Sequence, residues 1–395
     1  MRPAEPEDFS LLLPDSPNLA EAASRWRSAY VHVPFCVRWC PYCDFTVVEG
    51  RLDEADRYVD ALVEEVRTAP PWGSLDAVFF GGGTPSLLNG RSIGRVLEAL
   101  EERFGFSDRL EVSLEANPED FSEEQAARIV EAGVNRVSFG AQSMDPEVLS
   151  RLGRRHTPED VFGGVENARK AGASSIALDL IFGTPGESLE SWGRTISRAL
   201  DVHPDHISAY ALTIEPHTVF GREVRRGGPA PDEDIQATMW EMASEALQGA
   251  GLIRYEISNF SKIGHVCRYN LSVWGRGEYL GFGLGAHWFR DGTRGVNVRR
   301  LDTYIQRVEA GIGAIQHTER VEGWAAEQER LMLGLRRAAG VLPGKGGAVL
   351  GYSEEGRRLM GAGVLGWRGD RLVVERPLLT DTATRAVLGL SEPLQ

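Results

Sequence analysis

The sequence predicts an α/β protein whose main part is a partial (β/α)6 TIM-like barrel, followed by a small C-terminal α+β module. Two observations lead to this prediction. From residue 30 to about residue 213, short apolar runs rich in β-branched and aromatic residues alternate with stretches of helical period. After about residue 320 the order becomes helices, a hairpin and a last helix, which resembles a winged helix.

The six expected strands are apolar on both faces, and polar residues, Gly or Pro follow each of them. They cover residues 30–35, 76–83, 110–118, 136–143, 176–183 and 206–213, with helices expected between them at 53–68, 122–133 and 188–200. Strands that are apolar on both faces indicate a parallel sheet covered by helices. The polar or Gly-rich residues after every strand favour a barrel or partial barrel over an open sheet, and in that architecture the carboxyl ends of the strands carry the chemistry.

The same pattern divides the chain into four segments. They are a lead-in at 1–28, the barrel at 29–220, an extension at 221–319 and the C-terminal module at 320–395. The lead-in is expected to be loose because it is rich in Pro and acidic residues. The extension is expected to hold a loop at 221–234, a helix at 234–247 and irregular strands at 254–260 and 275–289, and the module helices at 325–339 and 353–360.

The chain is strongly acidic: 57 Asp and Glu against 43 Lys and Arg give a net charge of −14. Such a chain repels polyanions, so nucleic acid is not expected as a partner, and the C-terminal module is expected to serve packing rather than DNA binding. A DNA-binding regulator is therefore the least favoured function. The sequence has no apolar stretch long enough for a signal peptide or a membrane helix, so a cytoplasmic location is expected.

Three of the four cysteines, Cys36, Cys40 and Cys43, form a C-x3-C-x2-C pattern after the first expected strand. In a reducing compartment such a group indicates a metal site rather than a disulfide. Three thiolates can hold three irons of a cubane iron–sulfur cluster and leave the fourth iron open for a ligand. The alternative is a zinc site completed by His32 or Asp44, although the sequence has no second C-x2-C half.

A glycine run, Phe80-Gly81-Gly82-Gly83-Thr84-Pro85, follows the second expected strand. Glycine lets backbone groups approach a ligand closely, because a Cβ would prevent that approach. Turns also use glycine, so the run alone is a weak signal. One strand after the cysteine pattern, it becomes a strong one.

Together these motifs resemble the radical S-adenosylmethionine (SAM) superfamily. Within it, roughly residues 30–290 are similar to the oxygen-independent coproporphyrinogen oxidases and their relatives, the heme chaperones of the HemW type. The resemblance is carried by YVHVPFC, CPYCDF, FFGGGTPS, SLEANPE, RVSFGAQS, LDLIFGTPG and AYALTIEP. It implies a radical SAM barrel, a [4Fe-4S] cluster on the three cysteines, and SAM bound beside it.

The resemblance also implies which residues bind SAM. Tyr30 would flank its methionine end, and Gly82, Gly83 and Thr84 would hold its amino and carboxylate groups. The other implied residues are Tyr42, Glu115, Gln142, Arg154, Asp179 and Ala211. The chemistry of these residues agrees with SAM binding. Carboxylates at strand ends can bind a sulfonium or ribose hydroxyls, and an arginine can form two parallel hydrogen bonds to a carboxylate. For Arg154 a solvated helix cap is the alternative.

Three features separate the two branches of this resemblance. The oxidases carry a further cysteine two positions after the third ligand, where this chain has Phe45, and they have a longer N-terminal arm. Both differences favour the chaperone branch. The chaperones, however, carry a His-Asn-x-x-Tyr-Trp motif for heme, and the matching residues here are Tyr269, Asn270, Val273 and Trp274.

The altered motif leaves the heme ligand open. Tyr269 can replace the missing histidine, because phenolate is a heme ligand that favours ferric iron. His265 is the other leading candidate, ahead of Cys267 and His287, while Asn270 and Trp274 remain as motif residues. The alternative for Cys267 is a small buried hydrophobe, and for each histidine a hydrogen-bonded loop residue.

Two functions follow from the resemblance. The first is a protein that binds the cluster, SAM and heme or a porphyrin, and passes heme to apo-hemoproteins. It would need an electron donor for the cluster, and a homodimer is one option for its assembly. The second is an oxygen-independent coproporphyrinogen III oxidase, in which a radical derived from SAM starts the decarboxylation of propionates. Whether the chain is an enzyme is left open.

Overall fold

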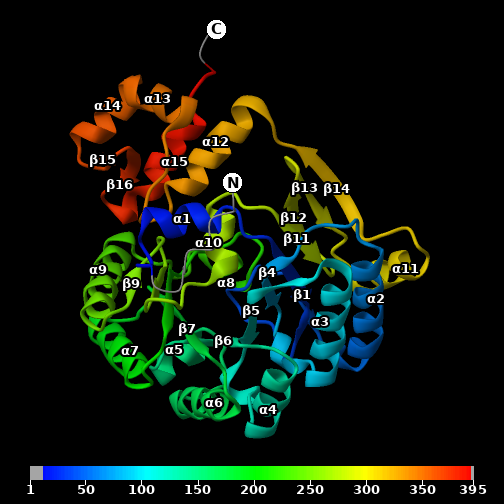
Figure 1. The fold of residues 1–395 in the computed structure, drawn as a ribbon. Coiled ribbons are helices and arrows are strands. Elements are labelled where there is room, and N and C mark those ends of the chain that lie inside the picture. The colour runs from blue at the N-terminus through cyan, green and yellow to red at the C-terminus, as the bar shows by residue number, and fades with distance from the viewer. Residues whose placement is uncertain (1–11, 393–395) are drawn as a thin grey trace.

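The computed structural model describes residues 12–392, which contain a large open sheet with helices around it (Figure 1). Its centre consists of six parallel strands: β1 (Ser28–Val33), β4 (Leu75–Gly82), β5 (Phe106–Ala116), β6 (Arg136–Gln142), β7 (Ser175–Phe182) and β8 (His206–Ala211). These strands lie next to one another in chain order. The predicted partial (β/α)6 barrel is therefore confirmed.

Further strands extend the sheet at both edges. The added elements are β11 (Tyr279–Phe282), β12 (His287–Arg290), β13 (Thr293–Asn297) and β14 (Ile315–Arg320) beyond β1, and β10 (Asn259–Ser261) and β9 (Ile253–Arg254) beyond β8. β11 pairs with β1 in parallel, whereas the other added strands pair antiparallel. β9 to β12 overlap the segments expected to hold irregular strands, 254–260 and 275–289, whereas β13 and β14 lie outside them and were not predicted.

Helices cover the outer face of the sheet and form an arc around it (Figure 1). They are α2 (Ala55–Thr68), α3 (Gly90–Phe104), α4 (Glu123–Glu131), α5 (Pro146–Arg151), α6 (Pro158–Ala171), α7 (Leu189–Asp201), α9 (Glu233–Gly249) and α11 (Leu301–Glu309). Polar N-caps start most of them: Asn89, Ser122, Thr157, Ser188 and Asp232 each accept a backbone N–H of the first turn. Their apolar sides and the outer faces of the strands form the main core.

Two segments that were expected to lack regular structure contain helices. In the lead-in, α1 (Pro17–Ala23) buries Leu19 and Ala23 against Tyr255 and Leu271, so its apolar residues have a partner surface. The first eleven residues of the lead-in lie outside the described part. In the expected loop at 221–234, α8 (Val219–Arg225) begins at a Thr218 cap.

The C-terminal module holds α12 (Gly323–Gly334), α13 (Gly344–Tyr352), α14 (Glu354–Gly361), the hairpin β15 (Leu365–Arg368) and β16 (Arg371–Val374), and α15 (Thr380–Leu388). This is the expected winged-helix-like order with one helix added. α13 was missed because its sequence, GKGGAVLGY, contains four glycines, which are poor helix formers. The module has a hydrophobic core of its own.

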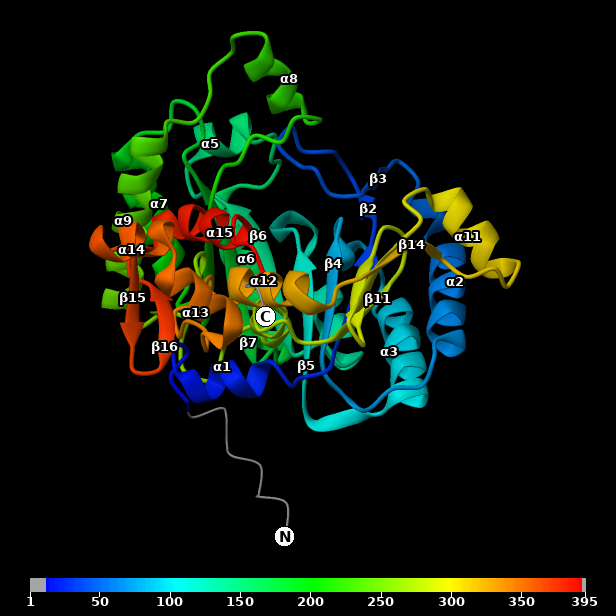
Figure 2. The same ribbon diagram turned by 90° about the horizontal axis from the view of Figure 1, so that it is seen from above.

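The C-terminal module packs against α1 and against α10 (Arg268–Trp274) (Figures 1 and 2). Arg337 donates to the Ala20 carbonyl at 2.8 Å, and Arg371 pairs with Glu21 at 3.0 Å. Arg336 lies over the Trp274 ring, 5.3 Å from its centroid. No helix within residues 12–392 has both the length and the apolar character needed to cross a membrane.

The separate core of the C-terminal module makes its stability testable. Leu350 is fully buried there, so Leu350→Ala is expected to lower the free energy of unfolding by about 3 kcal/mol through lost contacts and a cavity. Leu342→Ala in the same module is the matched control, since Leu342 is 42% exposed. Urea denaturation followed by circular dichroism measures both. Equal losses in the two variants would contradict the assignment of Leu350 to this core.

Candidate functional site

The cysteine loop is held at the carboxyl ends of β1 and β4. Gly83 N–H donates to the Val33 carbonyl at 2.7 Å, and Thr84 N–H donates to the Phe35 carbonyl at 2.8 Å. The short strand β2 (Phe35–Cys36) then pairs in parallel with β3 (Val48–Glu49). The first cysteine therefore follows directly from the end of the sheet.

Cys36, Cys40 and Cys43 are all free and half-buried in this loop. The Cys36 sulfur lies 3.7 Å from the Thr84 hydroxyl, and the Cys40 sulfur lies 3.8 Å from Nη1 of Arg154. Burial raises the pKa of Cys36 to about 11 and raises that of Cys43. Thiolates here therefore need a cationic partner, which iron would supply.

The geometry does not favour the single zinc ion considered above. Both ring nitrogens of His32 are engaged: Nε2 donates to the Thr46 carbonyl at 2.7 Å, and Nδ1 accepts from the Tyr30 hydroxyl at 3.0 Å. Within residues 12–392, no three His, Cys, Asp or Glu side chains converge where one ion could bind. A cubane cluster has no such requirement, because each thiolate binds a different iron.

The glycine run after β4 leaves no room for side chains. Gly82 has φ +112°, and a Cβ built on it would lie 2.4 Å from the His32 ring. A Cβ on Gly83 would lie 2.6 Å from the Pro34 carbonyl oxygen. The run thus brings backbone groups to the edge of the cysteine loop, as its sequence suggested.

Two buried carboxylates lie on the inner face of the sheet. Glu115 accepts the Gly82 N–H at 3.1 Å, and Asp179 accepts the Ser138 hydroxyl at 3.0 Å. Burial, together with the negative charge of Asp179, raises the pKa of Glu115 to about 8. Neither carboxyl group forms a salt bridge within the described residues, so Glu115 and Asp179 can supply negative charge to a bound cation once Glu115 loses its proton.

Arg154 joins the cysteine loop to the inner face. Its Nη2 donates to the Asn117 side-chain oxygen at 2.6 Å and to the Gly140 carbonyl at 3.0 Å, while Asn117 donates to the Thr84 hydroxyl at 3.2 Å. Its Nε is buried without a partner among residues 12–392. Arg154 is therefore not a solvated cap. Asn117, which the sequence analysis missed, stands in the SLEANPE motif and could have been singled out there.

The remaining residues implied for SAM also lie at this end of the sheet. Gln142 ends β6 with φ +59°, a strained backbone for a residue other than glycine. Ala211 is exposed at the end of β8. Tyr42 packs beside a small core that includes Leu152 and Ile181. The structure thus brings all of these residues to the carboxyl ends of the strands or to the inner face.

Of the heme candidates, His265 lies apart from the cysteines, near the amino ends of the strands. His265 Nδ1 bonds the Ser175 hydroxyl at 3.1 Å, where β7 begins. The side chain of His265 is half-buried, which lowers its pKa. Cys267 is only 2% exposed, so the alternative of a buried hydrophobe describes it well. Asn270 and Trp274 follow on α10 and are partly buried.

Tyr269 belongs to a group of stacked rings inside the barrel. Its ring centroid lies 5.7 Å from that of Tyr30 and 5.1 Å from that of Phe79, and it meets Tyr279 edge-on at 5.8 Å. Burial raises the pKa of Tyr269 well above its usual value. The phenol is therefore held in its protonated form, which is not the form that binds ferric iron.

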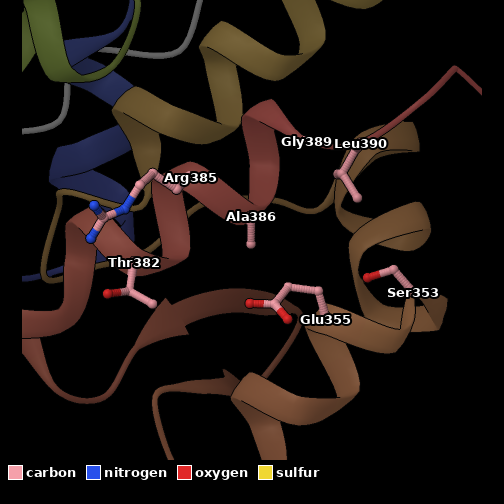
Figure 3. Close-up of a pocket in the computed structure, with 7 residues that line it drawn as sticks. All are labelled: Ser353, Glu355, Thr382, Arg385, Ala386, Gly389 and Leu390. Carbon is pink, nitrogen blue, oxygen red and sulfur yellow. The ribbon is translucent and has the colours of Figure 1, made fainter.

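A pocket of about 500 Å³ lies away from this site, between α14 and α15 of the C-terminal module (Figure 3). Two of its polar side chains, Glu355 and Ser353, already have partners on α14. The Glu355 carboxylate is held by Arg358 at 2.6 and 2.9 Å, and the Ser353 hydroxyl caps α14. This hollow offers no convergent set of groups, so the cysteine loop and the inner face remain the candidate site.

The fold and the cysteine loop define a radical SAM protein. In agreement, the sequence profile of the Radical SAM superfamily matches residues 30–199. More narrowly, the chain belongs to the family of HemW heme chaperones. It is 38% identical over 384 residues to the heme chaperone HemW of Mycobacterium tuberculosis, with 94% of this chain and 97% of that protein covered. It is 38% identical over 322 residues to the HemW of Bacillus subtilis, with 80% and 84% covered.

The fold is also similar to a solved structure, that of coproporphyrinogen III oxidase (HemN) from Escherichia coli. The TM-score is 0.79 and the sequence identity 22%, with 94% of this chain and 93% of that chain covered. At this identity the likeness supports the architecture and carries no conclusion about substrate.

Membership of the radical SAM superfamily implies a [4Fe-4S] cluster and SAM, and the residues fit both groups. The three free thiols share one loop, and the Arg154 guanidinium beside Cys40 can offset the negative charge of a thiolate-bound cluster. For SAM, the glycine run, the unpartnered Arg154 Nε and the carboxyl groups of Glu115 and Asp179 suit a zwitterion with an added sulfonium charge, which would take the place of the Glu115 proton.

Removing one thiol tests the cluster. Cys40→Ala is expected to reduce the bound iron from about four atoms per chain to almost none after anaerobic reconstitution, because two thiolates do not hold the cubane. Cys267→Ala is the matched control, since this fully buried cysteine lies away from the loop and should leave iron binding unchanged. Iron analysis with circular dichroism measures both variants. Full iron content in Cys40→Ala would refute the assignment.

The raised pKa of Glu115 predicts how SAM binding depends on pH. Below about pH 8 the carboxyl is protonated in the free protein, and a cation must displace that proton. The SAM affinity should therefore rise by up to tenfold per pH unit as the pH increases toward about 8, and then level off.

Equilibrium dialysis of SAM across this pH range measures the effect. Glu115→Gln should bind SAM more weakly and lose the pH dependence. Glu65→Gln is the control, because Glu65 is another buried carboxyl with its pKa raised to about 7, but it hydrogen-bonds Tyr304 away from the inner face. A pH dependence that survives in Glu115→Gln would exclude Glu115 as its source.

Proposed function

We propose that this protein is a heme chaperone that holds a [4Fe-4S] cluster, SAM and heme, and delivers heme to apo-hemoproteins. The observation that carries the proposal is the 38% identity to a heme chaperone over 97% of that protein's length, with the cysteine loop and the inner-face residues included. The absence of a cysteine at position 45, where Phe45 stands, agrees with the chaperone branch.

In this proposal each residue has a stated task at the carboxyl ends of the strands. Cys36, Cys40 and Cys43 hold the cluster, which supplies electrons and an open iron when bound. Gly82 and Gly83 admit the methionine end of SAM, and Thr84 hydrogen-bonds it. The ten SAM contacts proposed are Tyr30, Tyr42, Gly82, Gly83, Thr84, Glu115, Gln142, Arg154, Asp179 and Ala211.

Among the heme candidates, His265 is better suited than Tyr269 as the iron ligand. Its Nδ1 is fixed by Ser175, while its Nε2 makes no hydrogen bond within residues 12–392 and the side chain is partly exposed. A histidine that is oriented through one ring nitrogen presents the other to a metal. Tyr269, in contrast, would have to leave its ring stack and lose its proton.

An anaerobic heme titration of the cluster-loaded protein tests this function. Saturation at about one heme per chain is expected, followed by transfer to an apo-hemoprotein that gains its characteristic absorbance. His265→Ala should weaken heme binding about tenfold or more, because a metal ligand is lost. Tyr269→Phe should change it little, because the stacked ring is kept.

Two outcomes would contradict parts of this proposal. Absence of heme binding by protein with an intact cluster would exclude the chaperone function, and decarboxylation of coproporphyrinogen III would then be the next activity to assay. Saturable binding that is lost in Tyr269→Phe but kept in His265→Ala would reverse the choice of ligand.

A further inference from the structure

The carboxyl end of β6 departs from a regular strand. The pairing with β7 moves from Phe139 opposite Leu178 to Gln142 opposite Leu180, so β6 carries one extra residue over this stretch. Gln142 ends the bulge with φ +59°. A bulge takes backbone groups out of the regular ladder, and buried backbone groups need hydrogen-bond partners. Groups from outside the sheet therefore have to hold this end of β6.

Two residues of the loop between α5 and α6 hold consecutive carbonyls of the bulge. Arg154 Nη2 donates to the Gly140 carbonyl at 3.0 Å, and His156 Nε2 donates to the Ala141 carbonyl at 2.9 Å. The Ala141 carbonyl also accepts the Ser143 N–H at 2.6 Å. The side chain of His156 is completely buried, so it acts through its neighbours and not on a ligand directly.

Glu119 fixes the orientation of the His156 ring. Its Oε2 lies 3.5 Å from Nδ1, and neither of these two buried atoms has a hydrogen-bond partner within residues 12–392. A ring turned by 180° would present carbon atoms to both the carbonyl and the carboxylate. Although burial raises the pKa of Glu119, its contacts with His156 and Arg154 lower that pKa overall, so the carboxylate beside the ring is charged.

These contacts join three segments at the carboxyl ends of the strands, which we call the β6 junction. The segments are residues 117–119 after β5, 140–142 at the end of β6 and 154–156 before α6. The first and third segments contact each other twice, since Asn117 accepts from Arg154 at 2.6 Å and Glu119 faces His156. A displacement of one segment is therefore transmitted to the other two.

The β6 junction places two of the residues proposed to bind SAM. A Cβ built on Gly140 would lie 2.8 Å from Nε2 of Gln142 and 3.5 Å from Nη2 of Arg154. The amide of Gln142 thus lies over the glycine, on the side of the guanidinium. Because a guanidinium suits a carboxylate, both side chains belong to the part of the site where the amino-acid end of SAM is expected.

We propose that His156 is a positioning residue for SAM. It holds the bulge of β6, and through the bulge Gln142 and Arg154, in the arrangement that receives the amino-acid end of SAM, while Glu119 orients the imidazole. This inference rests on the proposed function, since it takes SAM to be bound at the inner face. A shift of about 1 Å in a binding group removes much of its interaction, so loss of the His156 donor reaches SAM without direct contact.

The test compares variants of the cluster-loaded protein. His156→Ala removes the donor to Ala141, whereas His156→Gln supplies another, because the amide nitrogen of glutamine also donates. The matched control is His206→Ala, which removes a second buried histidine, bonded to the Tyr255 hydroxyl at 2.8 Å at the start of β8. Equilibrium dialysis measures binding of SAM and of 5′-methylthioadenosine, which has the adenine and ribose but no amino-acid end.

His156→Ala is expected to bind SAM about tenfold more weakly and to bind 5′-methylthioadenosine as the unchanged protein does. His156→Gln should recover most of this loss, and His206→Ala should bind both probes normally. Glu119→Gln should bind SAM about threefold more weakly, because the ring loses its charged neighbour. Iron analysis and circular dichroism check that each variant is folded and keeps its cluster.

Three results would overturn the proposal. They are unchanged SAM affinity in His156→Ala, an equal loss for both probes, and a loss in His156→Gln as large as in His156→Ala. An equal loss for both probes would assign His156 to the stability of the fold alone. Should His156→Ala not fold, Glu119→Gln decides, because a loss confined to SAM supports the proposal and unchanged SAM binding contradicts it.

The same measurements separate this inference from the proposed function. Absence of SAM binding by the unchanged protein would refute the SAM site of the proposed function, and this inference with it. Normal SAM binding by the unchanged protein, together with normal binding by His156→Ala, would refute the role of His156 alone.

Discussion

Two backbone hydrogen bonds between the first loop and the end of β4 determine where the cysteines lie. They run from Gly83 to Val33 and from Thr84 to Phe35, and they require the two segments to approach so closely that Gly83 has no room for a Cβ. Cys36 follows at once, and the Thr84 hydroxyl lies beside its sulfur. The position of the metal site thus depends on a glycine in the neighbouring strand rather than on the cysteine loop itself.

The inner face connects two regions with different chemistry. At the carboxyl ends of the strands are thiols, carboxylates and a guanidinium, while His265, a candidate for heme, lies near the amino ends. Between them the rings of Tyr30, Phe79 and Tyr269 are stacked. These ring contacts extend from α10 to Tyr30, whose hydroxyl hydrogen-bonds His32. Tyr269 on α10 is therefore in direct ring contact with Tyr30, one of the residues proposed to bind SAM.

Much of the architecture could be predicted, because parallel strands covered by helices have a simple apolar sequence pattern. The cysteine site could be predicted because the spacing of its three cysteines is a local feature of the sequence. The position of β11 in the sheet could not be predicted, since YLGF is a four-residue strand whose partner, β1, lies far away in the sequence. Asn117 was missed because its role arises from contacts with Arg154 and Thr84, which come from other loops. Nor could local patterns reveal that His265 lies at the opposite end of the strands from the cysteines.

The pairing of β1 with β11 has a consequence for how the chain folds. Ser28 lies opposite Tyr279, so the strand that leads into the cysteine loop gains its second neighbour only after residues 279–282 have been synthesised. Closing so long a loop is entropically costly, and contacts of this range form late. Until then β1 is bounded by β4 alone, and the nascent chain exposes an unpaired strand edge next to three free thiols.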